Sequence, residues 1–287
     1  MLLLLFVSFI WAFSFGLIKG RLAGLDPVAI AAVRLAIAGL VFAPWILRTR
    51  SAGTLRWKLA AIGAVQFGIM YIAYLGAFAH LQAYEVALFT IFTPLYLTLI
   101  DALLERRWQG RHLLAAALAV VGAGVVLWRQ SAGSAVVTGF LLVQVSNLCF
   151  AAGQLAYRRL RPSFPEGLTD QKAFGWLCLG GCLTTVLASV PFASWSEFHP
   201  TGIQWVVLIY LGGVSSGLGF YLWTLGSVQV NAGTLAAFNN AKVPLGVACS
   251  LLFFRESAHV PRLVISLLLL GLAIWIAERP ARGARPA

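Results

Sequence analysis

The sequence is built almost entirely from apolar runs about as long as a membrane is thick, joined by short polar connections. A spanning helix needs about 20 mostly apolar residues to cross a hydrocarbon core of about 30 Å. The runs lie at about 2–18, 28–47, 59–79, 86–104 and 112–128, and then at about 135–157, 173–192, 203–225, 232–254 and 263–277. Because the runs are continuous rather than alternating, they do not fit the strands of a β-barrel. We therefore expect an all-α integral membrane protein with ten transmembrane helices.

The composition excludes a soluble enzyme. Only 10% of the 287 residues are charged and 60% are hydrophobic, whereas a soluble domain carries roughly 25% charged residues. The formal net charge of +12 could suggest nucleic acid, but the basic residues fall in short connections between helices. The lipid bilayer is thus the expected partner, with no nucleic acid and no cofactor. No metal site is expected either, because four cysteines lie within apolar runs without metal-ligand spacing: Cys149, Cys178, Cys182 and Cys249.

The distribution of basic residues predicts the orientation of the chain. If the N-terminus is inside the cell, fourteen Lys and Arg residues fall in inner connections and five in outer ones, with Arg34 and Lys242 inside helices. This bias predicts an inner-membrane, multi-pass protein with both termini in the cytoplasm. Arg255 and Arg262 in the last outer connection argue the other way locally. The first ten residues lack a basic start and a cleavage site, so a retained first helix is expected.

The two halves of the sequence resemble each other. Gly76, Ala83 and Pro94 have counterparts 150 positions later in Gly226, Gly233 and Pro244. Glu105 and Glu256 are 151 positions apart, and Gly122 and Gly271 are 149 apart. Because five spans per repeat is an odd number, the second copy must cross the membrane upside down. We expect two inverted five-helix repeats, 1–130 and 131–287, the construction that many secondary transporters use to form two states of similar energy.

Several short motifs resemble a known family. They are Trp11-Ala-Phe-Ser-Phe, Asp26-Pro27 followed by Arg34, and the helices of Pro94 and Pro244, each followed by an acidic residue. With ten spans in two repeats, this pattern resembles the EamA-type branch of the drug/metabolite transporter superfamily. The stretch at 237–244 is similar to bacterial aromatic amino-acid exporters. The resemblance implies export of amino acids, aromatic ones included, although 147–154 departs from its counterpart around Trp11.

A lysine inside an apolar run is the strongest candidate for a binding residue. Polar groups in hydrocarbon are costly and mark a pathway or a packed interface. Lys242 lies near the middle of the ninth run, and Asn239 shares its helical face. We interpret Lys242 as a cationic centre that faces a watery cavity. The alternative is an ammonium bonded to carbonyls that Pro244 releases from the helix ladder.

Six further residues complete the predicted substrate-binding set, because they place polar or aromatic groups on one face of their helices: Trp11, Gln66, Tyr74, His80, Asn147 and Tyr221. Each has a structural alternative. His80 could face bulk water, Asn147 could bond a neighbouring helix, and the aromatic rings could pack in the core or contact lipid. The stretch Gly213 to Gly217 favours close helix packing. It also reads G-x-S-x-G, but a hydrolase needs this motif on a strand–turn–helix elbow rather than inside a helix.

The predicted function is a secondary transporter that exports small metabolites, amino acids among them, by alternating access around a central cavity. The acidic residues lie near helix ends or in loops, which disfavours proton coupling through a buried carboxylate, and no P-loop indicates ATP use. One lysine and no matching arginine in the core argue against a phosphate or nucleotide-sugar carrier. The alternatives are a transporter of other amphipathic compounds or drugs, a channel, and an intramembrane enzyme, which would need a catalytic cluster at membrane depth.

Overall fold

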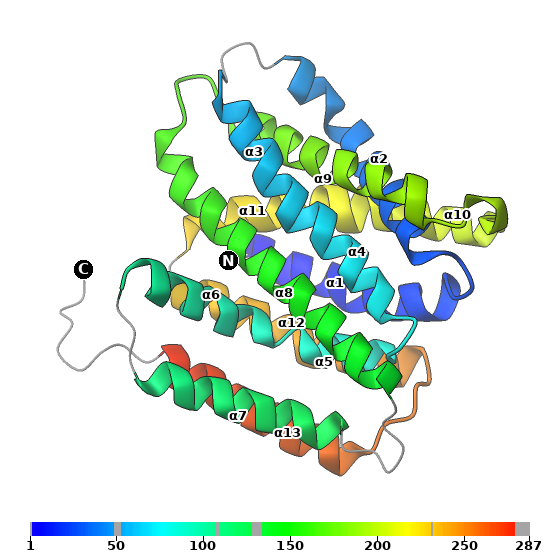
Figure 1. Ribbon diagram of the computed structural model, residues 1–287, viewed down its shortest axis with the longest axis vertical. Coiled ribbons are helices and arrows are strands. Elements are labelled where there is room, and N and C mark those ends of the chain that lie inside the picture. The colour runs from blue at the N-terminus through cyan, green and yellow to red at the C-terminus, as the bar shows by residue number, and fades with distance from the viewer. Residues whose placement is uncertain (1, 49–52, 107–109, 128–133, 231, 279–287) are drawn as a thin grey trace.

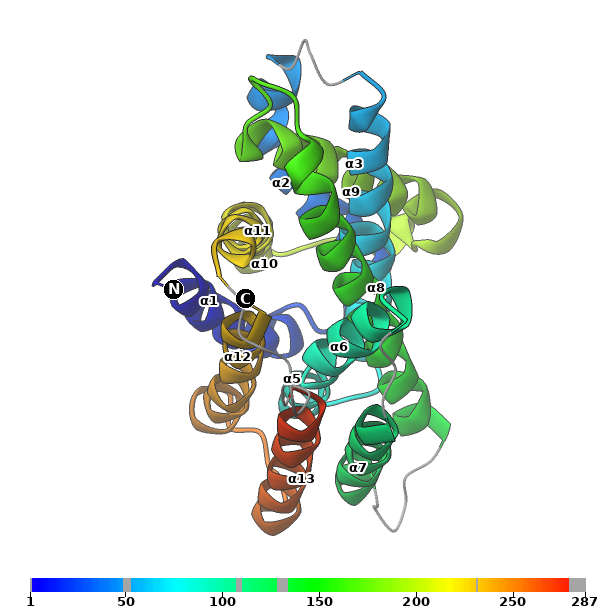
Figure 2. The same cartoon turned by 90° about the vertical axis from the view of Figure 1, so that its left-hand side faces the viewer.

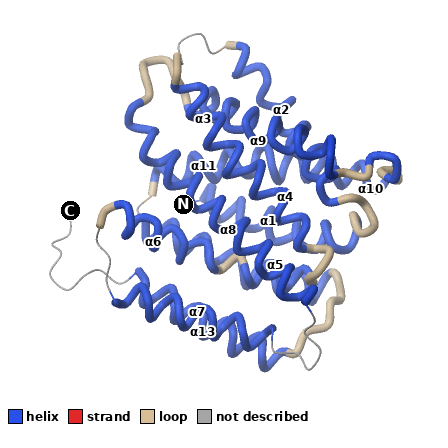
Figure 3. Tube along the Cα trace, in the orientation of Figure 1, coloured by secondary structure: helices blue, strands red, loops and turns tan. Residues whose placement is uncertain are grey.

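The computed structural model describes residues 2–48, 53–106, 110–127, 134–230 and 232–278. Within these ranges the regular elements are helices, with no strand (Figure 3). The first half contains α1 Leu2–Arg21, α2 Pro27–Leu47, α3 Leu55–Gly63, η1 Ala64–Ile69, α4 Met70–Ala77, α5 Ala83–Phe89, α6 Phe92–Leu104 and α7 Gly110–Leu127. The second half contains α8 Ser134–Leu160, η2 Arg161–Ser163, α9 Asp170–Phe192, η3 Trp195–Glu197, α10 Gly202–Ile209, η4 Tyr210–Leu218, α11 Gly219–Gln229, α12 Ala232–Phe253 and α13 Val260–Glu278. The all-α prediction is confirmed.

Many of these helices are long and apolar enough to cross a membrane. Seven described stretches qualify: Leu2–Arg21, Pro27–Leu47, Leu55–Ala77, Ala83–Leu104, Ser134–Ser163, Asp170–Phe192 and Gly202–Gln229. Three shorter apolar helices lie at Leu114–Val125, Lys242–Phe253 and Val260–Ile276. Large apolar side chains such as Leu40 and Val190 are exposed by 75% and 74%, as lipid-facing residues should be. The membrane-spanning character is confirmed, and the arrangement as ten spans in two inverted repeats stays a prediction.

The helices lie side by side in a slanted bundle (Figure 1). Figure 2 shows them closer to end-on, with α2, α3 and α9 at one end of the bundle and the pair α7 and α13 at the other. In between, α1 packs against α12, and α8 packs against α4 and α6. Helices from the two halves of the chain therefore contact each other throughout the bundle.

Three of the long helical stretches are interrupted. The segments η1 and η4 are π-helical, so each amide bonds to a carbonyl five residues back and the turn is wider than in an α-helix. The stretch of α5 and α6 breaks at Thr90 and Ile91. The Ser216 hydroxyl in η4 bonds to the Leu211 carbonyl at 2.8 Å. Such interruptions release backbone groups and change which side chains face the interior.

Asp26 and Pro27 start α2. One carboxylate oxygen of Asp26 accepts hydrogen bonds from the amides of Val28 and Ala29, at 2.8 and 2.9 Å, and Pro27 fills the first helical position, where no amide is needed. The other oxygen accepts a hydrogen bond from the Ser194 amide at 3.2 Å, which ties this helix start to the connection before α10. The cap thereby fixes the register of α2, on which Arg34 lies two turns further along.

Candidate functional site

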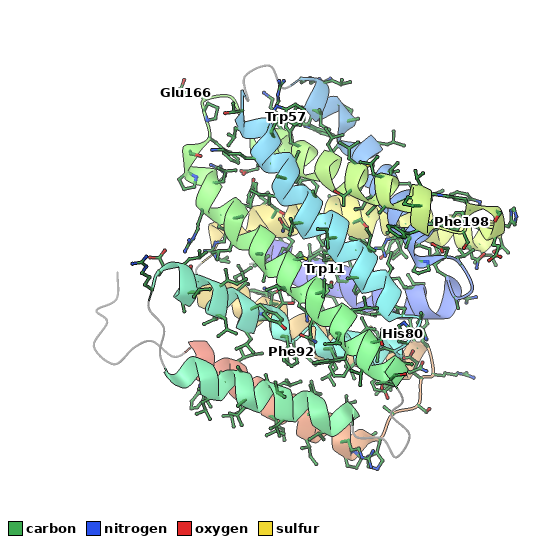
Figure 4. All side chains as sticks on the ribbon, in the orientation of Figure 1. Trp11, Trp57, His80, Phe92, Glu166 and Phe198 are labelled. Carbon is green, nitrogen blue, oxygen red and sulfur yellow. The ribbon has the colours of Figure 1, made fainter. Side chains whose placement is uncertain are left out.

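A cavity lies between the two halves of the bundle, with an empty volume of about 550 Å³ that includes open solvent. Residues from α1, α2, α4, α5–α6, α8, η4, α11 and α12 line it: Trp11, Ser14, Phe15, Arg34, Met70, Tyr71, Tyr74, Thr90, Thr93, Ser146, Asn147, Phe150, Ser215, Phe220 and Lys242. Figure 4 shows Trp11 near the middle of the molecule. The described lining contains both cationic and aromatic side chains but no Asp, Glu or His.

Arg34 is the more deeply buried of the two cations, with 1% of its surface exposed. Its Nη2 donates hydrogen bonds to the Tyr71 hydroxyl at 2.9 Å and to the Ser216 hydroxyl at 3.2 Å, and these hydroxyls also contact each other at 2.9 Å. The guanidinium carbon lies 4.7 Å from the centre of the Tyr71 ring. Its Nε and Nη1 groups have no hydrogen-bond partner among the described residues. A buried, fixed guanidinium with free donors is suited to binding an anion.

Lys242 is held differently, inside a cage of aromatic rings. Its Nζ lies 5.3 Å from the Trp11 ring centre, 5.6 Å from that of Phe150 and 5.8 Å from that of Trp223. Distances of this size allow cation–π attraction. Nζ also donates a long hydrogen bond of 3.4 Å to the Asn239 side chain. Since Lys242 is 6% exposed and lines the cavity, it adds a second positive charge to the site.

Neutral polar side chains of the site donate hydrogen bonds to backbone carbonyls where the helices are interrupted. Asn147 donates a hydrogen bond of 2.8 Å to the carbonyl of Phe89, the last residue of α5, and accepts one of 3.2 Å from the Thr93 hydroxyl. The Trp11 indole donates a hydrogen bond of 3.1 Å to the Ser215 carbonyl in η4. The hydroxyls of Ser14 and Ser215 lie 2.9 Å apart. These bonds satisfy carbonyls at the end of a helix and within a π-helical segment, and fix the shape of the cavity.

Five of the eight predicted binding residues come together at this cavity. Trp11, Tyr74, Asn147 and Lys242 line it, and Asn239 bonds Lys242. The other three lie outside the lining: Gln66, Tyr221 and His80.

The π-helical segments explain two of these three placements. Gln66 lies within η1, where the wider turn delays the rotation of the helix, so its face differs from that of Tyr74, and it packs against α8 at Gly153. Tyr221 follows η4 and contacts the rings of Phe42 and Phe174, at 5.5 and 5.6 Å between ring centres. A constant rotation of 100° per residue therefore misplaces both side chains.

His80 lies beyond the end of α4, in the turn before α5. Figure 4 shows it near the ends of the helices, away from Trp11. Its Cβ atom lies close to Gly139 of α8. It is thus placed in a connection and not along the face that Tyr74 shares.

The expectation of a core with one lysine and no arginine is wrong, because Arg34 is buried and lines the cavity. Its position in the middle of an apolar run was the available signal, since a charge at membrane depth marks a functional position by default. Ser14 and Ser215 also line the cavity and were not predicted. Small hydroxyls in apolar runs give no distinctive sequence pattern, so only the folded structure shows that these two serines line the cavity.

Comparisons with known proteins identify the family of this chain. The EamA-like transporter family matches residues 1–128. The biotin transporter of Escherichia coli (strain K12) is 38% identical over 279 residues, which cover 96% of this chain and 92% of that protein. The biotin transporter of Salmonella typhimurium is 37% identical over the same length, and a probable biotin transporter of Pseudomonas aeruginosa is 36% identical over 283 residues, covering 95% of this chain and 96% of that protein.

A crystal structure of a protein with 20% sequence identity superposes with a TM-score of 0.69 and covers 96% of each chain. At this identity the similarity supports the fold alone. The relatives are named as transporters, which agrees with the prediction of a non-enzymatic function, but their names refer to biotin and give no support to amino-acid export. On the extent and identity of these matches, the chain is a small-molecule transporter that belongs to the EamA-like family of the drug/metabolite transporter superfamily.

Proposed function

We propose that the protein carries biotin, or a closely similar amphipathic monocarboxylate, across the inner membrane. The observation that carries this proposal is Arg34, a buried guanidinium with two free donor groups in an aromatic-walled cavity. The names of the relatives make biotin the first candidate. The chemistry of the described site supports the same choice.

Biotin has three parts that need different surroundings. Its carboxylate needs a cation, which Arg34 supplies, with Lys242 contributing a second positive charge. Its apolar bicyclic ring fits against aromatic walls such as Phe150 and Phe220. Its ureido group both donates and accepts hydrogen bonds. Hydroxyls such as that of Ser146 can bond with it in either direction, because a hydroxyl is both a donor and an acceptor. The lining thus offers a suitable contact for each part.

An amino acid is the less favourable candidate. It would bring a positively charged ammonium into a cavity that already holds Arg34 and Lys242, and the described lining has no carboxylate to meet it. Like charges at low dielectric repel each other strongly. A monoanion without an ammonium avoids this repulsion, whether it is biotin or another small amphipathic acid.

For the mechanism, we propose alternating access by two inverted repeats, 1–130 and 131–287. Support comes from packing that is similar when the halves are exchanged: α1 contacts α12 as α8 contacts α6, and α3 contacts α9 as α2 contacts η4. In addition, π-helical segments occur in the third and the eighth apolar stretches, at η1 and η4. Two halves of the same construction can form states of similar energy that open to opposite sides.

We further propose that both termini are cytoplasmic. In Figure 1, α1 begins and α13 ends toward the left side of the molecule. Basic residues are concentrated at the helix ends on that side and just beyond them: Arg48 after α2, Arg56 and Lys58 at the start of α3, Arg106 after α6, Arg158 and Arg159 at the end of α8, and Lys172 at the start of α9. The positive-inside rule assigns that side to the cytoplasm.

Counterflow of labelled biotin in proteoliposomes tests the proposed function. We expect saturable uptake that unlabelled biotin on the opposite side stimulates, as for a carrier. Arg34→Gln should raise KM by about 10- to 100-fold, since a hydrogen bond to a charged group contributes about 1.5–3 kcal/mol. Arg56→Gln removes the same charge at an exposed position and should leave KM unchanged.

Three results would count against the proposal. One is an absence of biotin counterflow by the wild-type protein. Another is a rate that rises linearly with concentration without stimulation from the opposite side, which would indicate a channel. The third is wild-type kinetics in Arg34→Gln, which would remove Arg34 from the site.

A further inference from the structure

A second cavity lies near the point where α1 ends, α2 begins and α4 ends, at the right-hand side of Figure 1. Its walls are mostly apolar, with Leu22 and Leu75 among them, and the charged group in its described lining is Lys19. Under the proposed orientation this end of the molecule faces away from the cytoplasm. This space is distinct from the central cavity, because the two linings share no described residue.

The second cavity continues the first along the same helices. Phe15, Arg34 and Tyr74 line the central cavity, whereas Lys19, Ile30 and Phe78 line the outer one. Each of these residues is separated by four positions from its counterpart on the same helical stretch. Four residues of an α-helix advance by about 6 Å. The outer cavity therefore lies about one helical turn outward from the central one.

An aromatic partition lies between the two cavities. The Tyr74 ring contacts Phe15 on the α1 side, with 6.1 Å between ring centres, and Phe78 on the outer side, with 5.2 Å. Both contacts are edge-on. A substrate that passes between the cavities must displace these rings, so the partition would hold it briefly on one side.

Lys19 supplies the outer cavity with a positive charge. Its Nζ donates a hydrogen bond of 2.7 Å to the Phe78 carbonyl. An ammonium has three N–H donors, so further donors remain for a ligand. Lys19 is half-buried, and the described lining of this cavity contains no acidic side chain. An apolar pocket with one cation suits the same kind of molecule as the central site, an amphipathic carboxylate.

We propose that this outer cavity is a second, transient binding site for the transported carboxylate, with Lys19 as its anion-binding group. The substrate passes between Lys19 and Arg34 through the aromatic partition of Phe15, Tyr74 and Phe78. The inference rests on the proposed function, because it assumes that the carboxylate crosses the central cavity.

The first test compares the kinetics of biotin and its uncharged amide from the outer side, in intact cells. Lys19→Met should raise the external KM for biotin about fivefold, the upper range for a partly exposed ion pair. It should leave kcat for biotin and KM for the amide unchanged. Lys19→Arg should restore the KM for biotin to within about twofold of wild type. Arg21→Gln, a loss of charge at the exposed end of the same helix, is the matched control.

A structural role for Lys19 predicts different kinetics. If Lys19 only caps the end of α4 through the Phe78 carbonyl, Lys19→Met should impair biotin and the amide equally. That result, or an unchanged KM for biotin, would overturn the inference.

The second test separates the outer site from the central one. Ala79 lines the outer cavity, so Ala79→Cys can report occupancy through its reaction with a charged, impermeant thiol reagent added outside. Labelling of the protein without this substitution gives the background from the four native cysteines. We expect biotin to slow the reaction in the wild-type and Arg34→Gln backgrounds but not in Lys19→Met.

The results of these tests distinguish failure of the outer site from failure of the proposed function. Protection that requires Arg34 rather than Lys19, in a protein that transports biotin, would overturn the outer site alone. A wild-type protein that neither transports biotin nor is protected by it would overturn the proposed function and the outer site together.

Discussion

At the scale of single residues, the two cations of the central cavity are stabilised in different ways. Arg34 is fixed by the hydroxyls of Tyr71 and Ser216 and keeps free donors, whereas Lys242 is surrounded by rings. Arg34 is therefore equipped to bond a carboxylate directly. Lys242 acts on it mainly through its charge, whose effect is strong because the Lys242 side chain is buried and little screened by water.

This difference predicts the behaviour of Lys242→Met. The apolar methionine side chain can occupy the aromatic cage, where sulfur–ring contacts are favourable, so the protein should fold. The KM for biotin should rise about tenfold, while the KM for its uncharged amide should not change. Counterflow of biotin and of the amide measures these KM values, with Lys58→Met as a control at an exposed position. An equal loss for acid and amide would show that Lys242 serves the structure and not the charge of the substrate.

At the scale of helices, the sequence predicts where the apolar runs lie but not where the helices are interrupted. Hydrocarbon demands about 20 apolar residues per span, and that requirement is visible in the sequence. A shift to π-helical bonding changes no residue and leaves hydropathy unaltered, so η1 and η4 could not be predicted. A uniform α-helical rotation therefore predicts Gln66 and Tyr221 at the cavity, where they do not lie. Arg34, by contrast, is visible in the sequence as a charge inside an apolar run, so its place in the cavity was predictable.

Close approach between helices gives a prediction for glycines. A Cβ atom at Gly180 of α9 would lie 1.8 Å from the Ala60 carbonyl oxygen of α3, whereas one at Gly213 meets nothing within 4 Å. Gly180→Ala should therefore force the helices apart and destabilise the protein by about 1–3 kcal/mol. Gly213→Ala should be neutral or slightly stabilising, because alanine favours helices.

Thermal unfolding of the purified protein, followed by tryptophan fluorescence, compares these two variants. A lower Tm for Gly180→Ala alone is expected. Equal Tm values for both variants would contradict the packing of α3 on α9. The Gly213 result also tests the prediction that the Gly213–Gly217 stretch serves close packing, since only Gly217 of the pair lies near another helix, at Ala38.

At the scale of the whole molecule, contacts join the two halves at both ends. At the outer end, the Glu256 carboxylate accepts hydrogen bonds from the amides of Ala83 and Tyr84, at 2.8 and 2.9 Å. At the inner end, Arg159 pairs with Asp101 and Glu105, at 3.0 and 2.8 Å. Alternating access requires that each end can open, so these contacts should set the balance between the two states.

Glu256→Gln should favour opening at the outer end, because a neutral amide bonds the start of α5 less strongly than a carboxylate does. A cysteine at Ser14 in the cavity should then react faster with an impermeant thiol reagent added outside. Arg159→Gln should slow the same reaction, but by less than about fivefold, since its ion pairs are partly exposed. Equal rates in all three backgrounds would show that these contacts do not control access.

Transport as proposed depends on Arg34 binding a carboxylate in the cavity between the two halves of the chain. An experimental structure of the protein with biotin bound would show whether Arg34 does so. We expect biotin between α1, α2, α8 and α12, with its carboxylate within hydrogen-bond distance of Arg34 Nε or Nη1 and its bicyclic ring against Phe150 and Phe220. Biotin bound at a different place, with Arg34 out of contact and the central cavity unchanged, would contradict this expectation.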